Sequence, residues 1–222
     1  MLAEELINPT TPVLSPSDSI GQAVDLMDEY GIKQLALVED EVYKGLLSEE
    51  TLLSLFDTSK LLSELYLPVD PIYANSFQHI YEVMGIANQY QLDTVPVLDE
   101  DKLYAGSILV SEMVGKFAHL LGTHETGAIL VLKMANRDYS LADISRLVES
   151  NNIKIISSYF SGAEYGSIDE ATLTLKLNKT EVSAAVATLE RFGYVVENIF
   201  GNDAPQNPDR HRLDLLLRYL ET

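Results

Sequence analysis

The sequence contains no cysteine and few basic residues, and each deficit excludes a class of site. Without cysteine there is no disulfide framework, no thiolate zinc site and no cysteine nucleophile. Only 15 of the 222 residues are Lys or Arg, against 34 Asp or Glu, so the formal net charge is −19. Nucleic-acid partners are therefore disfavoured, because phosphates are bound by clustered Lys and Arg.

Long apolar runs and targeting signals are also missing. No apolar run reaches the roughly 18 residues of a membrane span, so we expect no membrane partner. The first residues, Met1 to Glu5, lack the basic region that opens a signal peptide. Hydrophobic residues make up 46% of the chain, which is enough for a packed core. These features predict a soluble, acidic, cytoplasmic protein.

Catalytic and metal-binding motifs are absent from the sequence. There is no glycine-rich phosphate loop, no Gly-x-Ser-x-Gly turn and no His-Glu-x-x-His pair. His119 and His124 are five residues apart, a helical spacing that does not align two side chains, so we expect no metal site. The acidic triplets at 39–41 and 99–101 are explained either as weak Ca²⁺ or Mg²⁺ ligands or, more simply, as polar turns. We therefore expect that the protein is not an enzyme.

The first half of the chain is an internal repeat. Near residues 31–47 and again near 91–108 it reads as an apolar run, an acidic triplet, a second apolar run and a glycine, which predicts strand, turn and strand. The offset between copies is 60 residues before the triplet and 61 after it. Apolar residues at helical spacing precede each hairpin from Ile20 and from Phe77, and follow it near Leu52 and Met113. Ser17 or Ser19 is the expected cap of the first helix, and Ser76 that of the second.

This repeat resembles the CBS domain, whose copies pair into a Bateman module. The matching stretches include Val13 to Pro16 before the first helix, Gly45 to Ser48 after the first hairpin and Val95 to Asp99 in the second copy. The resemblance covers about residues 5–120. It implies a mixed α+β (α/β) fold of two tandem repeats.

The resemblance also implies a ligand site, because many CBS pairs bind adenosine-type ligands between their repeats. It assigns contacts to a Ser or Thr hydroxyl and to an Asp three residues later, which accepts both ribose hydroxyls. Those positions hold Ser48 and Thr51 in one copy, and Leu109 and Glu112 in the other, so neither pair is complete. The candidate residues are Lys33, Gln34, Ser48, Thr51, Asp93, Thr94 and Glu112. AMP, ADP, ATP and S-adenosylmethionine are the candidate effectors, and a structural pair without such a ligand is the alternative.

From Thr126 onward a different pattern begins. Strand-like and helix-like segments alternate in the order βαββαβ over about 75 residues, which predicts a ferredoxin-like unit. The stretch from Asn136 to Ile144 resembles the ACT domain's Asp-Arg-Pro-Gly-x-Leu-x-x-Ile. ACT domains are regulatory, often bind amino acids at this turn, and commonly do so across a dimer. The candidate turn residues are Asn136, Arg137, Asp138, Tyr139 and Ser140, and the alternative is a domain without ligand in which Tyr139 fills the space that a glycine leaves open.

We thus expect repeats at 1–62 and 63–122, an ACT-like domain at 126–201 and an amphipathic helix at 206–222. This order is similar to that of acetoin-utilisation-type CBS proteins, whose role is regulatory. The sequence predicts a non-enzymatic, homodimeric sensor of a small metabolite. The alternative is a ligand-independent scaffold that holds another protein.

Overall fold

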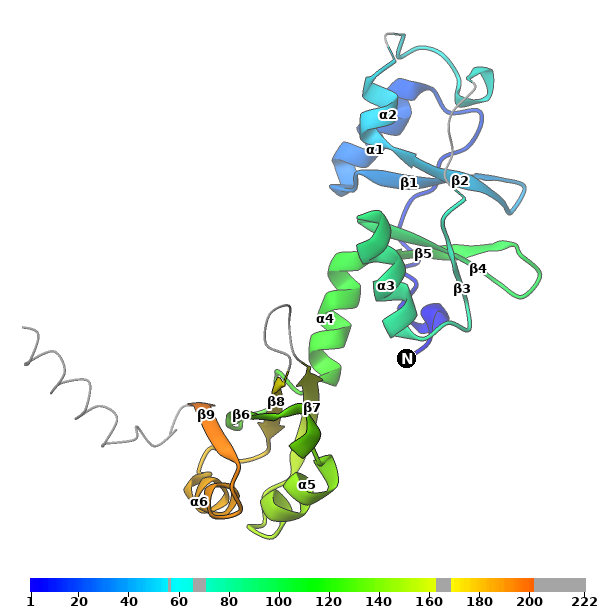
Figure 1. Cartoon of the computed structure of the whole chain (residues 1–222). Coiled ribbons are helices and arrows are strands. Elements are labelled where there is room, and N and C mark those ends of the chain that lie inside the picture. The colour runs from blue at the N-terminus through cyan, green and yellow to red at the C-terminus, as the bar shows by residue number, and fades with distance from the viewer. Residues whose placement is uncertain (56, 66–70, 163–168, 202–222) are drawn as a thin grey trace, which may run out of the picture. The chain divides into compact units, whose positions relative to one another are not determined.

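The computed structural model describes residues 1–55, 57–65, 71–162 and 169–201. The chain divides into two units, Met1–Lys116 and Phe117–Thr222, which are described separately (Figure 1). The apolar pattern after the first hairpin also includes residue 56, and the pattern of the second half predicts a turn over 162–169. These positions and the predicted helix over 206–222 lie wholly or partly outside the described residues. Helices and sheets are both present, so the predicted mixed α+β class is confirmed. Among the described residues, no helix has the length and apolar composition needed to span a bilayer.

The first repeat consists of α1 (Ile20–Tyr30), β1 (Gln34–Glu39), β2 (Val42–Ser48) and α2 (Glu49–Leu53). Ser19 caps α1 through a capping box: its hydroxyl accepts from the Gln22 N–H at 3.2 Å, and the Gln22 side chain accepts from the Ser19 N–H at 2.8 Å. Gly31 ends the helix in the left-handed conformation (φ 63°), which glycine adopts without strain. Of the two predicted caps, Ser19 is the correct one.

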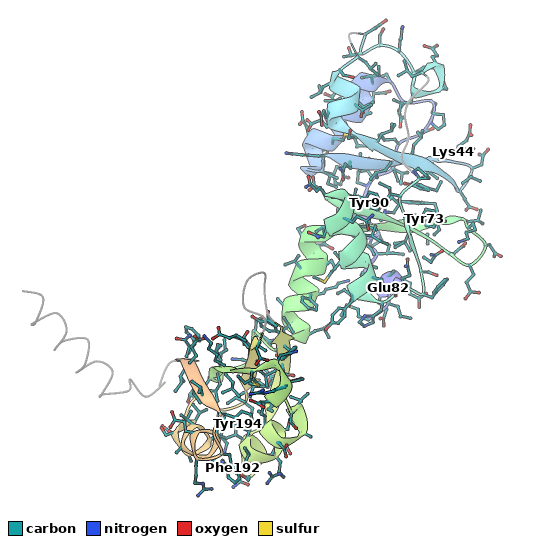
Figure 2. All side chains as sticks on the ribbon, viewed as in Figure 1. Lys44, Tyr73, Glu82, Tyr90, Phe192 and Tyr194 are labelled. Carbon is teal, nitrogen blue, oxygen red and sulfur yellow. The ribbon has the colours of Figure 1, made fainter. Side chains whose placement is uncertain are left out.

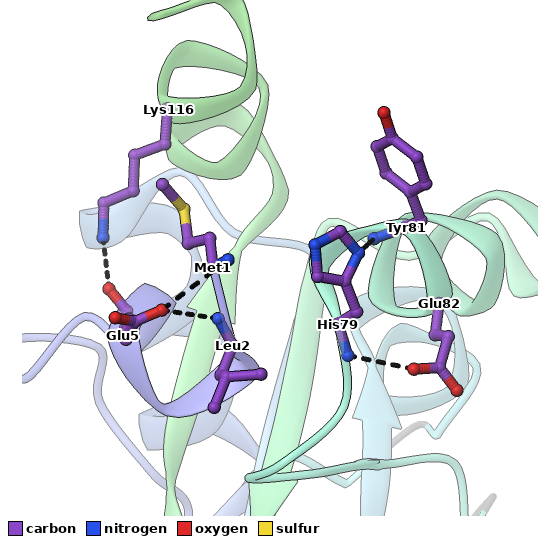
Figure 3. A network of polar contacts seen from close by, with 7 residues as sticks. All are labelled: Met1, Leu2, Glu5, His79, Tyr81, Glu82 and Lys116. Atoms are coloured by element: carbon purple, nitrogen blue, oxygen red, sulfur yellow. Dashed lines mark hydrogen bonds and ion pairs between the residues drawn. The ribbon is translucent and has the colours of Figure 1, made fainter. Parts of the chain in front are cut away.

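The second repeat contains β3 (Ala74–Asn75), α3 (Ile80–Tyr90), β4 (Thr94–Leu98), β5 (Tyr104–Leu109) and α4 (Val110–Leu120). The predicted cap Ser76 is wrong, because its N–H bonds the Leu98 carbonyl and thereby extends the pairing of β3 with β4. His79 caps α3 instead. Its ring Nδ1 accepts from the Tyr81 N–H at 3.4 Å, and Glu82 accepts from the His79 N–H at 2.9 Å (Figure 3).

The two repeats correspond residue by residue. Both hairpins shift register at equivalent points, between Leu37 and Val38 and between Val97 and Leu98. A parallel pairing joins Leu14 to Leu37 in one copy and Ala74 to Val97 in the other, again 60 residues apart. Each copy buries its own apolar side chains; those of the first are Leu14, Ile20, Ala23, Met27, Ile32, Leu35, Leu37, Leu47, Leu52 and Leu62.

The segments that lead into the repeats are exchanged. The N-terminal turn η1 (Ala3–Leu6) lies on the second repeat, where the Ala3 N–H bonds the Gln78 carbonyl and the Asn8 N–H bonds the Ser107 carbonyl. Residues near η2 (Leu62–Glu64) lie on the first repeat instead. Lys116 of α4 adds a 2.9 Å hydrogen bond to the Glu5 carbonyl (Figure 3). This exchange ties the two repeats into one unit.

Tyrosines join the hairpins of the two repeats. The rings of Tyr43 and Tyr104, equivalent residues 61 positions apart, stack with centroids 6.5 Å apart, and Tyr73 meets Tyr43 edge to face (Tyr73 is labelled in Figure 2). The Tyr104 hydroxyl shares a 2.8 Å hydrogen bond with Ser107. Burial raises the pKa of the Tyr104 phenol, and the Ser107 hydrogen bond only partly opposes that effect.

The second unit contains β6 (Ile129–Ala135), η3 (Asn136–Asp138), α5 (Leu141–Glu149), β7 (Ile155–Ser161), β8 (Glu170–Leu177), α6 (Ser183–Arg191) and β9 (Val195–Phe200). The four strands form an antiparallel sheet in the order β7-β8-β6-β9, the ferredoxin-like arrangement that the sequence predicts. Alternate residues of β8, from Ala171 to Leu177, are buried. Together with α5 and α6 they form the core of this unit.

Candidate functional site

The two repeats meet where the first strand of each hairpin begins. The Gln34 side chain of the first repeat accepts a hydrogen bond from the Asp93 N–H of the second at 3.1 Å. On either side, equivalent backbone bonds join the Lys33 carbonyl to the Glu49 N–H and the Asp93 carbonyl to the Val110 N–H, at 2.8 and 2.9 Å. The structure therefore brings the candidate residues before β1 and β4 to one junction, next to the starts of α2 and α4.

Thr94 contributes a buried hydroxyl at this junction. It follows Asp93 directly, its side chain is not exposed, and its Oγ1 has no hydrogen-bond partner among the described residues. A buried polar group without a partner costs free energy unless water or a ligand satisfies it. The Thr94 hydroxyl is thus a buried polar group at the junction whose hydrogen bond none of the described residues supplies.

Ser48 and Thr51 are close together but bonded to each other. Ser48 is the N-cap of α2, where its hydroxyl accepts from the Thr51 N–H at 3.2 Å and lies 2.8 Å from the Thr51 hydroxyl. A ligand that used either hydroxyl would compete with this local pair. Lys33 is exposed, with no ion pair within the part of the chain that the structure describes, and so it is available to an anionic group.

Glu112 is engaged by a partner that the sequence does not indicate. Its Oε1 accepts from the Asn8 side-chain N–H at 2.7 Å, across 104 residues of sequence. The N-terminal segment therefore occupies the carboxylate that the resemblance assigns to ligand. Of the predicted residues, Lys33, Gln34, Asp93 and Thr94 share the junction, while the Glu112 carboxylate is committed to Asn8.

A groove between α3 and α4 is the site feature that the sequence analysis missed. It has a volume of about 420 Å³ and is lined by Met84, Ala87, Asn88, Gln91, Leu92, Asp93, Val110, Met113 and Val114. The apolar residues here belong to the helical pattern that the sequence assigns to a core. Periodicity does not separate a side chain that packs inward from one that lines an open groove, so no sequence signal distinguishes them.

The turn that resembles the ACT ligand site is occupied by its own side chains. The Tyr139 ring lies 4.2 Å from the Phe160 ring, centroid to centroid, and packs on the core of the second unit. Ser140 caps α5 by accepting from the Asp143 N–H at 3.3 Å. Arg137 and Asp138 are exposed and form an ion pair, with 3.7 Å between the Arg137 Nε and Asp138 Oδ1 atoms. The Asn136 N–H donates a hydrogen bond to the Asp169 carbonyl. Tyr139, one of the predicted ligand residues of this turn, thus packs against Phe160 and the core of the second unit.

One expectation about the histidines is wrong. His119 and His124 stack in parallel, with ring centroids 3.9 Å apart and an 8° angle between the planes. α4 ends at Leu120, and the chain then turns back at Gly122 (φ 69°), so helical spacing does not apply to the pair. Among the described residues, no group of three His, Asp or Glu side chains is placed to hold a metal ion.

Comparison with known families finds a match that includes the first repeat. The sequence model of the CBS domain family matches residues 3–57. Similar solved structures include a CBS domain pair/ACT domain protein from Thermotoga maritima, which is 17% identical over 55% of this chain and 99% of its own, with a TM-score of 0.48. CBSX2 from Arabidopsis thaliana, solved in complex with AMP, is 17% identical over 53% of this chain and 96% of its own, with a TM-score of 0.47.

The cytosolic domain of the Mg²⁺ channel MgtE, solved in complex with ATP, is 19% identical over 52% of this chain and 48% of its own, with a TM-score of 0.43. Each of these likenesses covers about half of the chain. The family match over residues 3–57, together with the residue-by-residue correspondence of the second copy, supports a CBS domain pair in the first unit.

Proposed function

We propose that the protein is a non-enzymatic regulator that binds a small adenosine-type effector at the junction of its two repeats. The observation that carries the proposal is the hydrogen bond from the Asp93 N–H to the Gln34 side chain, next to Thr94, whose buried hydroxyl has no partner within the described part of the chain. These groups supply an amide, a carboxylate and a hydroxyl, which suit the hydrogen-bonding edges of a base and the hydroxyls of a ribose.

Charge narrows the class of effector. The candidate set before β1 and β4 holds one ammonium, Lys33, and one carboxylate, Asp93, within a half of the chain that has 20 acidic and 5 basic residues. A polyphosphate would enter this negative surrounding at a larger Coulombic cost than a monophosphate, which carries fewer charges and can pair with Lys33, whereas a cationic nucleoside would be attracted. The proposal therefore favours AMP or S-adenosylmethionine over ADP and ATP, unless Mg²⁺ accompanies the phosphates.

The experiment is a thermal-shift screen with AMP, ADP, ATP with and without Mg²⁺, S-adenosylmethionine, NAD(H) and the common amino acids. A ligand at 100 times its dissociation constant adds about 2.7 kcal/mol to the free energy of unfolding. We expect a shift with an adenosine compound that is lost in Thr94→Val and reduced in Lys33→Ala. Lys60→Ala, which removes another exposed lysine of the first unit, is the matched control. A shift with amino acids alone would place the effector site outside the junction.

A second candidate function is supported by predicted ligand residues that already bond or pack against other side chains of the same chain. Ser48 is bonded to Thr51, Glu112 to Asn8, and Tyr139 packs against Phe160. These contacts favour a ligand-independent dimeric scaffold, in which both domains are folded but neither binds a ligand. Absence of any shift across the panel, combined with recovery of one stoichiometric protein partner from lysate, would favour the scaffold. In either case we propose that the protein acts as a homodimer, with an ACT-like second unit.

A further inference from the structure

The start of β6 borders a polar cavity in the second unit. There Ile129 pairs with Lys176 of β8 on one side and with Phe200 of β9 on the other (the three strands are labelled in Figure 1). The cavity has a volume of about 270 Å³, and its lining includes Thr123, His124, Thr126, Gly127, Lys176 and Thr180. The turn over 136–140 that resembles the ACT ligand site follows the other end of β6, so the cavity is a separate feature.

Lys176 brings to this cavity a positive charge that no described carboxylate neutralises. Its partly buried side chain donates a 2.8 Å hydrogen bond from Nζ to the Gly127 carbonyl, which leaves two of its three N–H groups. Within the described residues, Lys176 forms no ion pair, whereas the Lys133 Nζ of β6 lies 2.9 Å from the Glu170 carboxylate. A lysine ammonium of this kind is a common ligand of phosphate groups.

Main-chain contacts hold the Lys176 ammonium in place. A Cβ added at Gly127 would overlap the Leu177 carbonyl oxygen, so only glycine lets the chain before β6 pack directly on the end of β8. Next to it, the Ala128 N–H bonds the Lys179 carbonyl at 2.8 Å, and the Leu177 N–H bonds the Ala128 carbonyl at 2.9 Å. The carbonyl to which Lys176 donates is therefore fixed, and the ammonium is positioned before a ligand binds.

Hydroxyl and imidazole groups add further hydrogen-bond donors. The hydroxyls of Thr126 and Thr180 have no hydrogen-bond partner among the described residues. His124 also lines the cavity and stacks on His119, with ring centroids 3.9 Å apart. Two protonated imidazoles at this distance would repel each other, and a bound anion would offset that repulsion. The groups that this part of the chain gathers thus suit a ligand with negative charge and several acceptor oxygens.

We propose that this cavity binds a small tetrahedral oxyanion, namely a phosphate group, with the Lys176 ammonium as its main ligand and the His124 ring and the threonine hydroxyls as further donors. Glu125 is the one carboxylate among the described lining residues, and its Oε1 lies beside Gly122. In a chain with a net charge of −19, such a local excess of donors is what an anion requires. The site belongs to the second unit and does not rest on the effector proposed for the junction of the repeats.

The test is an NMR titration of the full chain that follows the backbone amide signals. Phosphate and sulfate stabilise many folded proteins without a specific site, so binding is measured directly and at an ionic strength held constant with chloride. The probes are inorganic phosphate, AMP and adenosine. We expect saturable shifts of the Thr126, Gly127 and Thr180 amide signals with phosphate and no such shifts with adenosine. If AMP shifts them as well, the site takes phosphate groups of metabolites; if it does not, the ligand is the free ion.

Two lysine variants separate a site from a general charge effect. Lys176→Met keeps the aliphatic stem and removes the charge, while Lys154→Met removes an exposed lysine of the same unit that is not among the lining residues. We expect Lys176→Met to weaken phosphate binding about tenfold or more and Lys154→Met to change it less than about twofold, since a hydrogen bond to a charged group is worth about 1.5–3 kcal/mol. Unchanged amide signals away from the cavity show that each variant is folded.

Sulfate, a dianion throughout the range used, tests the role of His124. The titratable and charged groups around this ring are His119 of α4, Glu125 of the turn and Lys176 of β8. Imidazole donates from both nitrogens only when it is protonated, so sulfate should bind several-fold more tightly at pH 5.5 than at pH 7.5. His124→Phe keeps a ring against His119 and should remove this dependence.

The results that would overturn the site are equally definite. Absence of saturable shifts at these amides, or shifts that are as strong in Lys176→Met as in the wild type, would show that the cavity is not an anion site. A pH dependence that survives His124→Phe would remove His124 from the set of ligands. The effector screen is read on variants of Lys33 and Thr94 in the first unit, so its failure is distinguishable from failure of this site.

Discussion

Replacing Gly106 by alanine tests how the N-terminal segment is fixed to the second repeat. Gly106 lies on β5 with φ 147°, a conformation that residues with a side chain rarely adopt. A Cβ at this position would come within 2.5 Å of the Ile7 Cγ2 atom. Next along the chain, the Asn8 N–H bonds the Ser107 carbonyl at 2.9 Å, so Ile7 has little freedom to retreat.

The expected cost has two parts of similar size. The backbone conformation accounts for about 1–2 kcal/mol of the free energy of unfolding, and displacement of Ile7 for about as much again, which gives a loss of about 3 kcal/mol. Urea unfolding followed by circular dichroism measures this loss as a lower midpoint at an unchanged slope. In an Ile7→Ala background only the backbone part remains, so the two substitutions should couple by about 1–2 kcal/mol in a double-mutant cycle.

Two results would refute this reasoning. A Gly106→Ala loss below about 0.5 kcal/mol would mean that the strand accepts a side chain without strain. An equal loss with and without the Ile7 side chain would mean that the N-terminal segment does not lie against β5 in solution. The exchange of leading segments between the repeats would then be incorrect at that point.

Three further substitutions have expected outcomes. Tyr104→Phe should cost about 1 kcal/mol near neutral pH by leaving Ser107 without its partner. Burial raises the Tyr104 pKa, so the stability contributed by its protonated form is present below the unfolded pKa of about 10 and is lost as the pH rises through the folded value. The difference in free energy of unfolding between wild type and Tyr104→Phe should therefore narrow between pH 7 and pH 11. A difference that stays constant over this range would contradict the prediction. Ser48→Ala removes the α2 cap and should cost about 1 kcal/mol, measured by urea unfolding; no loss would show that the cap contributes nothing. Tyr139→Ala removes the ring packed on Phe160 and should cost about 2 kcal/mol, and if the ring blocks the turn, amino acids should then stabilise the variant in a thermal-shift assay; an unchanged melting temperature would contradict the packing.

The local features of the fold are predictable because short-range patterns encode them. The 3.6-residue spacing of apolar residues predicts α1 and α3, and the hydroxyl of Ser19 indicates where α1 starts. The failure at Ser76 has a local cause as well. That residue extends a strand pairing, and a histidine, which is not among the usual capping residues, takes the cap three positions later.

The candidate site is less predictable, because its key contacts join residues distant in sequence. The Asn8 side chain donates a hydrogen bond to Glu112, 104 residues away, and the Asp93 N–H donates one to the Gln34 side chain, 59 residues away. The His119–His124 stack depends on the turn at Gly122, which follows the end of α4. No periodicity or spacing rule carries information of this kind.

The sequence by itself determines the repeat and the order of helices and strands, because residue type and spacing encode both. Tertiary structure alone decides which polar groups remain available. It pairs Ser48 with Thr51, commits Glu112 to Asn8, leaves the Thr94 hydroxyl without a partner among the described residues, and opens a groove between α3 and α4. The physical reason is that a polar group that is bonded or buried within the chain is not available to a ligand, and only the folded chain sets which groups meet.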